Sequence, residues 1–375
     1  MINNNKKKIF YILIFFSFFL SISLSNYYIN SYDNYQLDQN THIMLKEETF
    51  AHWEHAAKII KQLKSGTSFF LAGEEVYTKP LPQRIVALYS LITNHNIIDD
   101  WTTFKITLGG KLLFLMIQSL IYYFSVFYFY KQISNYFNTN INILIIAFLC
   151  LEPTIFQYHS SFWTESFYFS LQLLILSFML NKTEFKFNYI IIGLLLGILS
   201  IQRTAGIFYI FVVLIYFYFT IKKDKFKKIL LVVLFYSLIL TGLGIHNLKR
   251  SEVFYIMPTE GKYSMYKYFA KGVLISSKKF TLKEANQIEV KKSLSWVKKN
   301  IPEIDYLNEV EINSPYELGL KIKNEKLRIK YYGYLNKRAY EILFDHPFDA
   351  FKKIVNGFIH FSVLNPFFVY YDYEY

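Results

Sequence analysis

Long apolar runs separated by short polar links dominate this chain. The first run covers residues 9–25. Six more follow it, at residues 111–130, 141–156, 165–180, 189–201, 205–221 and 229–245. About 20 predominantly apolar residues form a helix that crosses a bilayer. The pattern therefore predicts an all-α polytopic membrane protein with about seven transmembrane helices.

The first apolar run follows a basic triplet at residues 6–8. This combination occurs both in signal peptides and in uncleaved membrane anchors. The run is long enough to span, and the spans that follow make cleavage unnecessary for export of the next segment. We therefore favour an N-terminal transmembrane anchor at residues 1–26.

Residues 27–108 are polar and form the first of two long segments outside the apolar runs. We expect two helices in this segment, at residues 47–64 and from Leu81 onward, where prolines fit a helix start. Residues 109–246 then hold the other six spans as a transmembrane bundle.

Residues 247–375 form the second long polar segment, and proline and glycine divide it into short elements. We expect helices at residues 331–344 and 348–361. The second of these begins after Pro347, is amphipathic, and is predicted to lie near the membrane.

Lysines in the short links set the orientation of the spans. Lys131, Lys182, Lys186 and the run 222–228 fall on the same side as the N-terminal lysines when the spans alternate. Short basic links stay in the cytoplasm, whereas long segments cross regardless of charge. We predict an integral plasma (inner) membrane protein with a cytoplasmic N-terminus and both long polar segments extracytoplasmic.

The composition excludes several other classes of protein. The chain is 53% hydrophobic and carries a net charge of +13. Its lysines sit mainly at span ends and in one long segment, without a soluble recognition module, so no nucleic acid is expected as a partner. The single cysteine, Cys150, lies in an apolar run, which excludes a disulfide or zinc cluster within the chain.

The densest ionisable cluster lies at residues 46–55, in the first polar segment. It contains Glu47, Glu48, His52 and Trp53. Held beside a membrane, such groups can take a proton, bind a divalent cation or orient an acceptor hydroxyl.

The same stretch also fits an amphipathic helix that rests on lipid headgroups. Its charged residues would then face water. Its apolar residues would face the bilayer, namely Trp53, Ile59, Ile60 and Leu63. The residues alone leave both interpretations open.

Ionisable groups within or beside spans are costly and mark candidate sites. Glu165 opens one span, and Arg203 occupies a link too short to be a loop. A guanidinium there can hold a lipid phosphate through two hydrogen bonds, or it can rest on phospholipid headgroups. Glu152 can likewise face a cavity or simply reach the interface.

A basic cluster just outside the last span can hold a phosphate or can rest on outer headgroups. It comprises Lys249, Arg250 and Lys262. Histidine, tryptophan and tyrosine residues near span ends, such as Tyr263, are more often interface anchors than ligands.

Four separated segments resemble membrane glycosyltransferases of the GT-C class, specifically the bacterial dolichyl-phosphate-mannose:protein mannosyltransferase-like group. The segments are 47–53 (EETFAHW) with 79–82 (KPLP), 163–167 (WTESF), 193–204 (GLLLGILSIQRT), and 246–254 (HNLKRSEVF) with 258–266 (PTEGKYSMY). The chain departs from that pattern where Glu replaces the usual Asp, Thr204 replaces Pro and His246 replaces Arg. The family usually continues with further spans beyond the length seen here.

The resemblance implies a GT-C-like fold with helical extracytoplasmic loops. It also implies transfer of a sugar from a polyprenyl-phosphate-linked donor to a lipid, glycan or protein acceptor at the extracytoplasmic face. A lipid carrier suits this task, because nucleotide sugars are confined to the cytoplasm.

The resemblance also implies roles for individual residues. Glu48 or Glu47 would be the general base, and the spacing to Trp53 favours Glu48. Glu165 would be a second acid, and a divalent cation is expected at Glu48 and Glu165. The donor phosphate would be held by Arg203, Arg250, Lys249 and Lys262. The acceptor cavity would be lined by His52, Trp53 and Tyr263.

A proton- or ion-coupled transporter is the alternative function, because polytopic chains with intramembrane acids often carry ions. The lack of paired half-repeats with interrupted spans argues against it. The sequence contains no glycine-rich phosphate loop followed by Lys and Ser or Thr, no zinc-ligand spacing and no Gly-x-Ser-x-Gly elbow. These absences argue against an enzyme that is driven by nucleotide hydrolysis.

Overall fold

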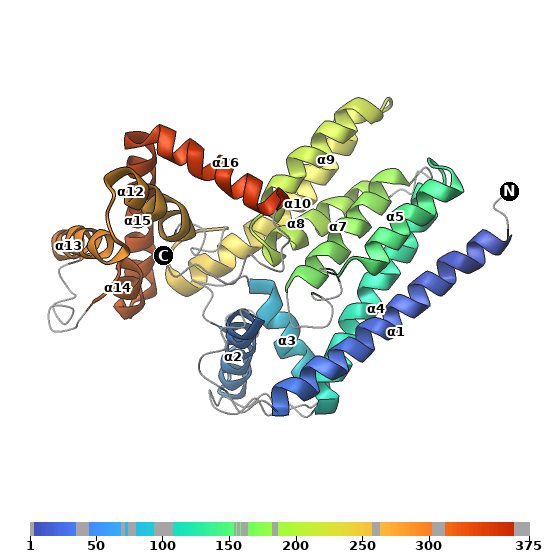
Figure 1. The fold of residues 1–375 in the computed structure, drawn as a ribbon, viewed down its shortest axis with the longest axis horizontal. Coiled ribbons are helices and arrows are strands. Elements are labelled where there is room, and N and C mark those ends of the chain that lie inside the picture. The colour runs from blue at the N-terminus through green and yellow to red at the C-terminus, as the bar shows by residue number, and fades with distance from the viewer. Residues whose placement is uncertain are drawn as a thin grey trace. The chain divides into compact units, whose positions relative to one another are not determined.

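A computed structural model describes residues 4–34, 45–68, 72–73, 80–93, 108–153, 155, 158, 164–181, 187–256, 263–301 and 312–363. Every regular element within these ranges is a helix (Figure 1). The chain divides into two compact units. The first comprises Met1–Gly73 with Lys79–His246, and the second comprises Glu74–Thr78 with Asn247–Tyr375.

The first unit holds the apolar helices. Their bounds are α1 Asn4–Asn34, α2 Leu45–Lys64, α3 Pro80–Thr93, α4 Leu108–Ile133, α5 Thr139–Leu151, α7 Thr164–Leu180, α8 Asn188–Gln202, α9 Gly206–Thr220 and α10 Lys225–Ser251. Three segments among the described residues are long and apolar enough to cross a membrane: Lys8–Asn26, Leu112–Ile133 and Lys225–Ser251. The prediction of a helical membrane protein is therefore supported.

The other four predicted spans correspond to shorter apolar helices, α5, α7, α8 and α9. These helices contain 13 to 17 residues. They measure about 20–26 Å at 1.5 Å per residue, whereas the hydrocarbon core is roughly 30 Å thick. The structure shows three candidate spans, and the count of seven stays a prediction.

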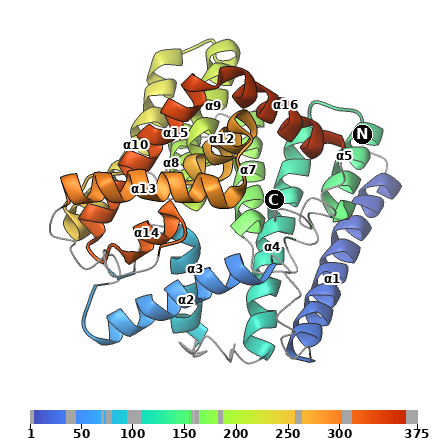
Figure 2. The same cartoon turned by 60° about the vertical axis from the view of Figure 1, so that its left-hand side comes forward.

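Helix α4 occupies the middle of one layer of the first unit. It packs against α1 and α7, and α8 continues the layer between α7 and α9 (Figures 1 and 2). Phe10 on α1 stacks on Tyr130 of α4 with ring centroids 3.6 Å apart. Phe15 and Phe124 on these helices are more than half exposed. Apolar side chains turned outward from apolar helices are what a lipid environment requires.

Helices α2 and α3 pack together through small and branched residues. Ala56, Ile59 and Ile60 of α2 are buried in one cluster with Val86 of α3 and Phe114 of α4. The alternative in which Ile59 and Ile60 face the bilayer is therefore wrong. These side chains are covered by protein, because α3 supplies the apolar surface that lipid would otherwise provide.

Helices α8 and α10 approach each other closely at two glycines. A Cβ added at Gly193 would stand 2.6 Å from the carbonyl oxygen of Val232, and one at Gly197 would stand 2.6 Å from Cβ of Ile239. Glycines four residues apart let helices in membranes bring their backbones together. The glycine-spaced motif of α8 therefore has a packing role, apart from any family resemblance.

The second unit is built around α15 and begins within the last turns of α10. Its elements are the π-helix η1 Met265–Ala270, α12 Lys271–Lys278, α13 Leu282–Asn300, α14 Pro315–Lys321, α15 Glu325–Asp345 and α16 Pro347–Val363. Side chains of α15 form the centre of its apolar core, including Tyr331, Tyr332, Leu335 and Ala339. Helix α15 begins earlier than expected because Asn324 caps it, accepting a hydrogen bond from the amide of Leu327 at 3.2 Å.

Helix α16 begins at Pro347, as the sequence indicated, and it is amphipathic. Phe348, Phe351 and Ile354 lie mostly exposed on one side. The other side of α16 packs against η1 and α12. One side of the helix is therefore exposed and the other is covered by protein.

A buried carboxylate joins α13 to α15. Glu289, 1% exposed, accepts two hydrogen bonds of 3.1 Å from the Arg338 guanidinium and one of 3.0 Å from Lys292. Burial acts to raise the pKa of Glu289, but the hydrogen bonds and charges of Arg338 and Lys292 outweigh it and hold that pKa below its usual value. Arg338 also pairs with the exposed Glu341 at 3.0 Å.

We expect Gly197→Ala to lower the apparent unfolding midpoint of the purified protein in detergent, because the added methyl overpacks the α8–α10 contact at a cost of about 1–3 kcal/mol. Gly242→Ala on α10 is the matched control, since a Cβ there meets nothing within 4 Å. Size-exclusion chromatography of heated samples measures both midpoints. Equal midpoints for the two variants would contradict the close approach.

We expect Glu289→Gln to destabilise the protein at neutral pH by about 1–3 kcal/mol, because it removes the buried one of the two carboxylates that Arg338 binds. A carboxyl whose folded pKa is depressed stabilises the fold above the unfolded pKa of about 4.3, and that contribution is lost as pH falls through the folded pKa. The difference in midpoint between wild type and variant should therefore shrink in acid. Glu341→Gln, on the exposed side of the same arginine, should change stability little at any pH.

Candidate functional site

The structure brings Glu165 and Arg203 together as an ion pair. Arg203 Nη1 contacts Glu165 Oε1 directly, and the Glu165 side chain is 5% exposed. Glu165 lies in the first turn of α7, and Arg203 follows the last residue of α8. The sequence indicated both residues as candidates at the ends of separate spans, but it gave no sign that they are partners.

A tight junction between α8 and α9 places Arg203. Its backbone is extended, its amide donates to the carbonyl of Leu199, and its own carbonyl accepts a 2.9 Å hydrogen bond from Gly206. A Cβ at Gly206 would lie 2.5 Å from the Leu199 carbonyl oxygen. Glycine at this position therefore lets α9 start directly over the end of α8, with Arg203 at the turn.

An aromatic ring adds a second contact to the guanidinium. The Cζ atom of Arg203 lies 5.8 Å from the ring centroid of Tyr168, which follows Glu165 by three residues on α7. This distance is within the range of a cation–π interaction. The Arg203 side chain is still one-third exposed, so it can meet a ligand while Glu165 and Tyr168 hold its orientation.

A fixed guanidinium with an accessible portion suits binding of an anion. Arg203 has five N–H donors in one plane, and a single carboxylate cannot occupy all of them. Phosphate and carboxylate groups match this planar geometry. The buried carboxylate also keeps the charge of Arg203 compensated when no ligand is bound.

The acidic cluster of the first polar segment lies at the start of α2. Glu47, Glu48, His52 and Trp53 are all within its helical bounds, Leu45–Lys64. Their side chains lie outside the part of the chain that the structure describes. Their roles as base, metal ligand and cavity lining stay predictions.

Arg250 forms an ion pair within the second unit. Its Nη2 atom donates to Glu325 at 2.5 Å and to the Tyr255 hydroxyl at 2.8 Å. The Tyr255 carbonyl in turn accepts from Asn247 Nδ2 at 2.7 Å. Arg250 therefore ties the end of α10 to the start of α15, a structural task that the sequence did not indicate.

The remaining predicted residues of this unit differ in their surroundings. Lys249 is exposed in the last turn of α10, whereas Lys262 lies outside the described residues. Tyr263 is buried in the core, 5% exposed, and stacks on Tyr316 with centroids 4.4 Å apart. Its position favours a packing role over lining of an acceptor cavity.

One basic residue that the sequence analysis missed also contacts a motif residue. Arg84 on α3 lies with Nη2 3.4 Å from Nε2 of His246 and 3.2 Å from the carbonyl oxygen of Ala72. A guanidinium only donates, so Nε2 of His246 is the acceptor in this contact. Arg84 could have been recognised from the sequence as a candidate, because it is an arginine in an otherwise apolar helix.

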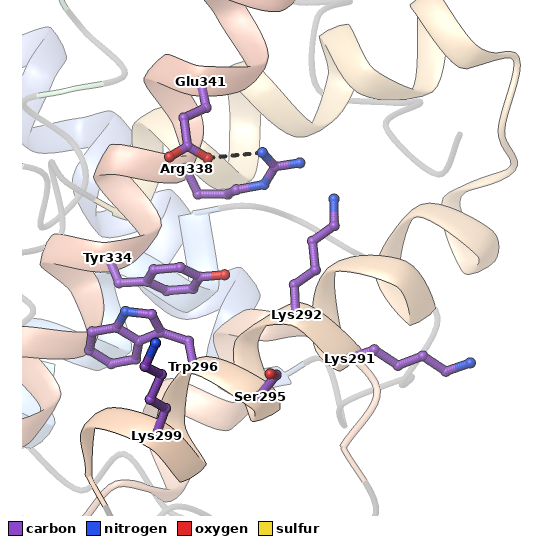
Figure 3. A pocket seen from close by; sticks show the side chains of 8 residues that line it. All are labelled: Lys291, Lys292, Ser295, Trp296, Lys299, Tyr334, Arg338 and Glu341. Carbon is purple, nitrogen blue, oxygen red and sulfur yellow. Dashed lines mark hydrogen bonds and ion pairs between the residues drawn. The ribbon is translucent and has the colours of Figure 1, made fainter.

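The second unit also carries a surface groove of about 540 Å³ between α13 and α15. Its lining residues are Lys291, Lys292, Ser295, Trp296, Lys299, Tyr334, Arg338 and Glu341 (Figure 3). Trp296 stacks on Tyr334 with centroids 4.7 Å apart. Two of its cations, Lys292 and Arg338, are already bound to Glu289.

Within the described residues, no group of three or more His, Cys, Asp and Glu side chains could hold a metal ion. The side chain of Glu48 lies outside the described residues, and Glu165 forms an ion pair with Arg203. Comparison of the chain with family models, curated proteins and solved structures found no match. The described residues are consistent with a helical membrane protein in which a partly buried ion pair joins the start of α7 to the end of α8.

We expect Arg203→Met to destabilise the protein more than the double substitution Arg203→Met with Glu165→Gln. The single variant leaves a buried carboxylate without its countercharge, whereas the double variant removes that charge as well. A double-mutant cycle on unfolding midpoints in detergent should give a coupling of about 1–3 kcal/mol. Additive effects of the two substitutions would show that the side chains do not form a pair.

Proposed function

We propose that the protein transfers a sugar from a polyprenyl-phosphate-linked donor to a lipid, glycan or protein acceptor at the extracytoplasmic face of the plasma membrane. The observation that carries this proposal is the partly exposed Arg203, oriented by the buried Glu165 at the junction of two apolar helices. A lipid donor places its phosphate at such a boundary. The resemblance of four segments to the GT-C class supports the same function.

In this proposal Arg203 binds the donor phosphate. The acceptor hydroxyl attacks the anomeric carbon, its proton passes to a carboxylate, and the bond from that carbon to the phosphate oxygen breaks. Negative charge then builds on the departing polyprenyl phosphate. A pre-oriented guanidinium stabilises this charge more in the transition state than in the ground state.

Glu165 is a positioning residue in this proposal, since its carboxylate holds Arg203. The positive charge of Arg203 disfavours a divalent cation on the same carboxylate. Any such cation would therefore depend on Glu48 and its neighbours. Glu48 is proposed as the base, with Glu47 as the alternative, because adjacent helical residues point about 100° apart and one of the two is expected to face the acceptor.

Among the other cations proposed for the phosphate, Arg250 already binds Glu325. Lys249 is exposed at the end of α10 and is the more available auxiliary. Lys262 is retained as an auxiliary by its place in the motif alone. These assignments leave Arg203 as the principal phosphate ligand.

The proposed topology places the N-terminus in the cytoplasm and adds α5, α7, α8 and α9 to the three longer spans. The short helices would cross where the bilayer thins or where flanking residues extend to the interface. Both long polar segments, and with them the acidic cluster of α2, would then be extracytoplasmic.

The test is complementation of a deletion strain, with glycolipids, surface glycans and glycoproteins compared by mass spectrometry. We expect the wild-type gene to restore formation of the missing product. Arg203→Lys should form that product at only about one hundredth of the wild-type rate, as on loss of one transition-state donor. Glu48→Gln should abolish the product while Glu47→Gln retains it. The reverse order of the two glutamates would move the base by one residue.

A proton- or ion-coupled transporter is the second candidate, because an ion pair among apolar helices can also carry ions. The same strains distinguish the two functions. If every glycolipid, glycan and glycoprotein is unchanged by deletion, the transferase proposal fails. Ion-dependent uptake by liposomes containing the protein, lost in Glu165→Gln, would then establish transport.

A further inference from the structure

A π-helix lies near the beginning of the second unit. Residues Met265–Ala270 form η1, and the amide of Lys271 donates to the carbonyl of Tyr266, five residues earlier. Helix α12 continues from it, and α16 packs against both elements. π-helical turns are rare and frequently occur at functional sites.

Three lysines gather where η1, α12 and α16 meet. Lys353 of α16 lies across Gly272, and a Cβ added at that glycine would collide with its ammonium group and stand 2.8 Å from its Cε atom. Lys271 is the neighbouring residue on α12. Lys267, four residues earlier, lies 4.9 Å above the ring of Tyr316. The glycine thus leaves the space that the Lys353 side chain occupies.

Two of these lysines, Lys271 and Lys353, are half-buried. Within the described residues, Lys271 and Lys353 form no ion pair or hydrogen bond with a carboxylate, not even with Asp349, one turn before Lys353 on α16. Burial lowers the pKa of both amines, and the charge of Lys267 lowers that of Lys271 further.

Two arginines of the second unit have carboxylate partners among the described residues. Arg338 binds Glu289, and Arg250 binds Glu325. Lys271 and Lys353 differ from these two arginines, because burial lowers the pKa of each amine and neither has a carboxylate partner among the described residues. An anion bound by both amines would offset their desolvation.

We propose that Lys271 and Lys353, across Gly272, form a binding site for a phosphate group. Lysine binds phosphate as a point charge, and the lack of a side chain at Gly272 leaves the space in which the Lys353 ammonium group lies against α12. The phosphate belongs either to a membrane lipid or to a free or polymeric phosphate. The exposed Phe348 and Phe351 on the far side of α16 favour a lipid source.

The first test is calorimetric titration of the full-length protein in detergent with inorganic phosphate, against chloride at matched ionic strength. We expect Lys353→Gln and Lys271→Gln each to weaken phosphate binding at least about tenfold, as on loss of a charge-assisted hydrogen bond. Lys352→Gln and Lys278→Gln remove the same charge from exposed neighbours and should stay within twofold. No phosphate binding, or equal losses in all four variants, would overturn the site.

Gly272→Ala tests the geometry separately from the charge. Its methyl group displaces the flexible end of Lys353, so the unfolding midpoint should change little while phosphate affinity falls several-fold. Wild-type affinity in this variant would contradict the placement of Lys353 over Gly272.

Native mass spectrometry with phosphatidic acid and phosphatidylcholine identifies the source of the phosphate. Selective retention of phosphatidic acid, lost in Lys353→Gln and kept in Lys352→Gln, would assign a lipid. If inorganic phosphate binds in the calorimetric titration but phosphatidic acid is not retained selectively, the site would be supported and its ligand would be a soluble phosphate. Neither measurement uses a sugar donor, so both test the phosphate site independently of the proposed transferase activity.

Discussion

Pairing of charges inside an apolar fold is the constraint on which both units depend. An ion removed from water costs several kcal/mol unless a partner lies within hydrogen-bonding distance. Glu165 meets this requirement through Arg203 in the first unit, and Glu289 meets it through Arg338 in the second. Each pair joins two different helices. The pairs therefore help to fix which helix ends and faces adjoin, because each charged group is stabilised only where its partner lies within reach.

The two pairs differ in what they leave accessible. Arg338 is 16% exposed, binds Glu289 through two hydrogen bonds and also contacts Glu341, so its donors are largely used within the fold. Arg203 is 33% exposed and is held from one side. The first arrangement is a brace between helices. The second combines a fixed orientation with donors available for a ligand, and this contrast singles out Arg203 for a role in binding.

The positions of the apolar helices could be predicted from sequence because burial in lipid or protein leaves a continuous hydrophobic signal. The end of α10 could not. The apolar run stops at residue 245, yet the helix continues to Ser251 because Asn247 and Arg250 find partners in Tyr255 and Glu325. The Glu165–Arg203 pair was likewise unpredictable, since it depends on how α7 and α8 pack. The π-helix η1 has no sequence signature of its own.

The exposed face of α16 has a practical consequence for handling the protein. Phe348 is 87% exposed and Phe351 67%, with Phe344 just before them also uncovered. A patch of this kind in water drives self-association. The polar C-terminal portion, although its composition suggests a soluble fragment, would be expected to aggregate when expressed alone without detergent.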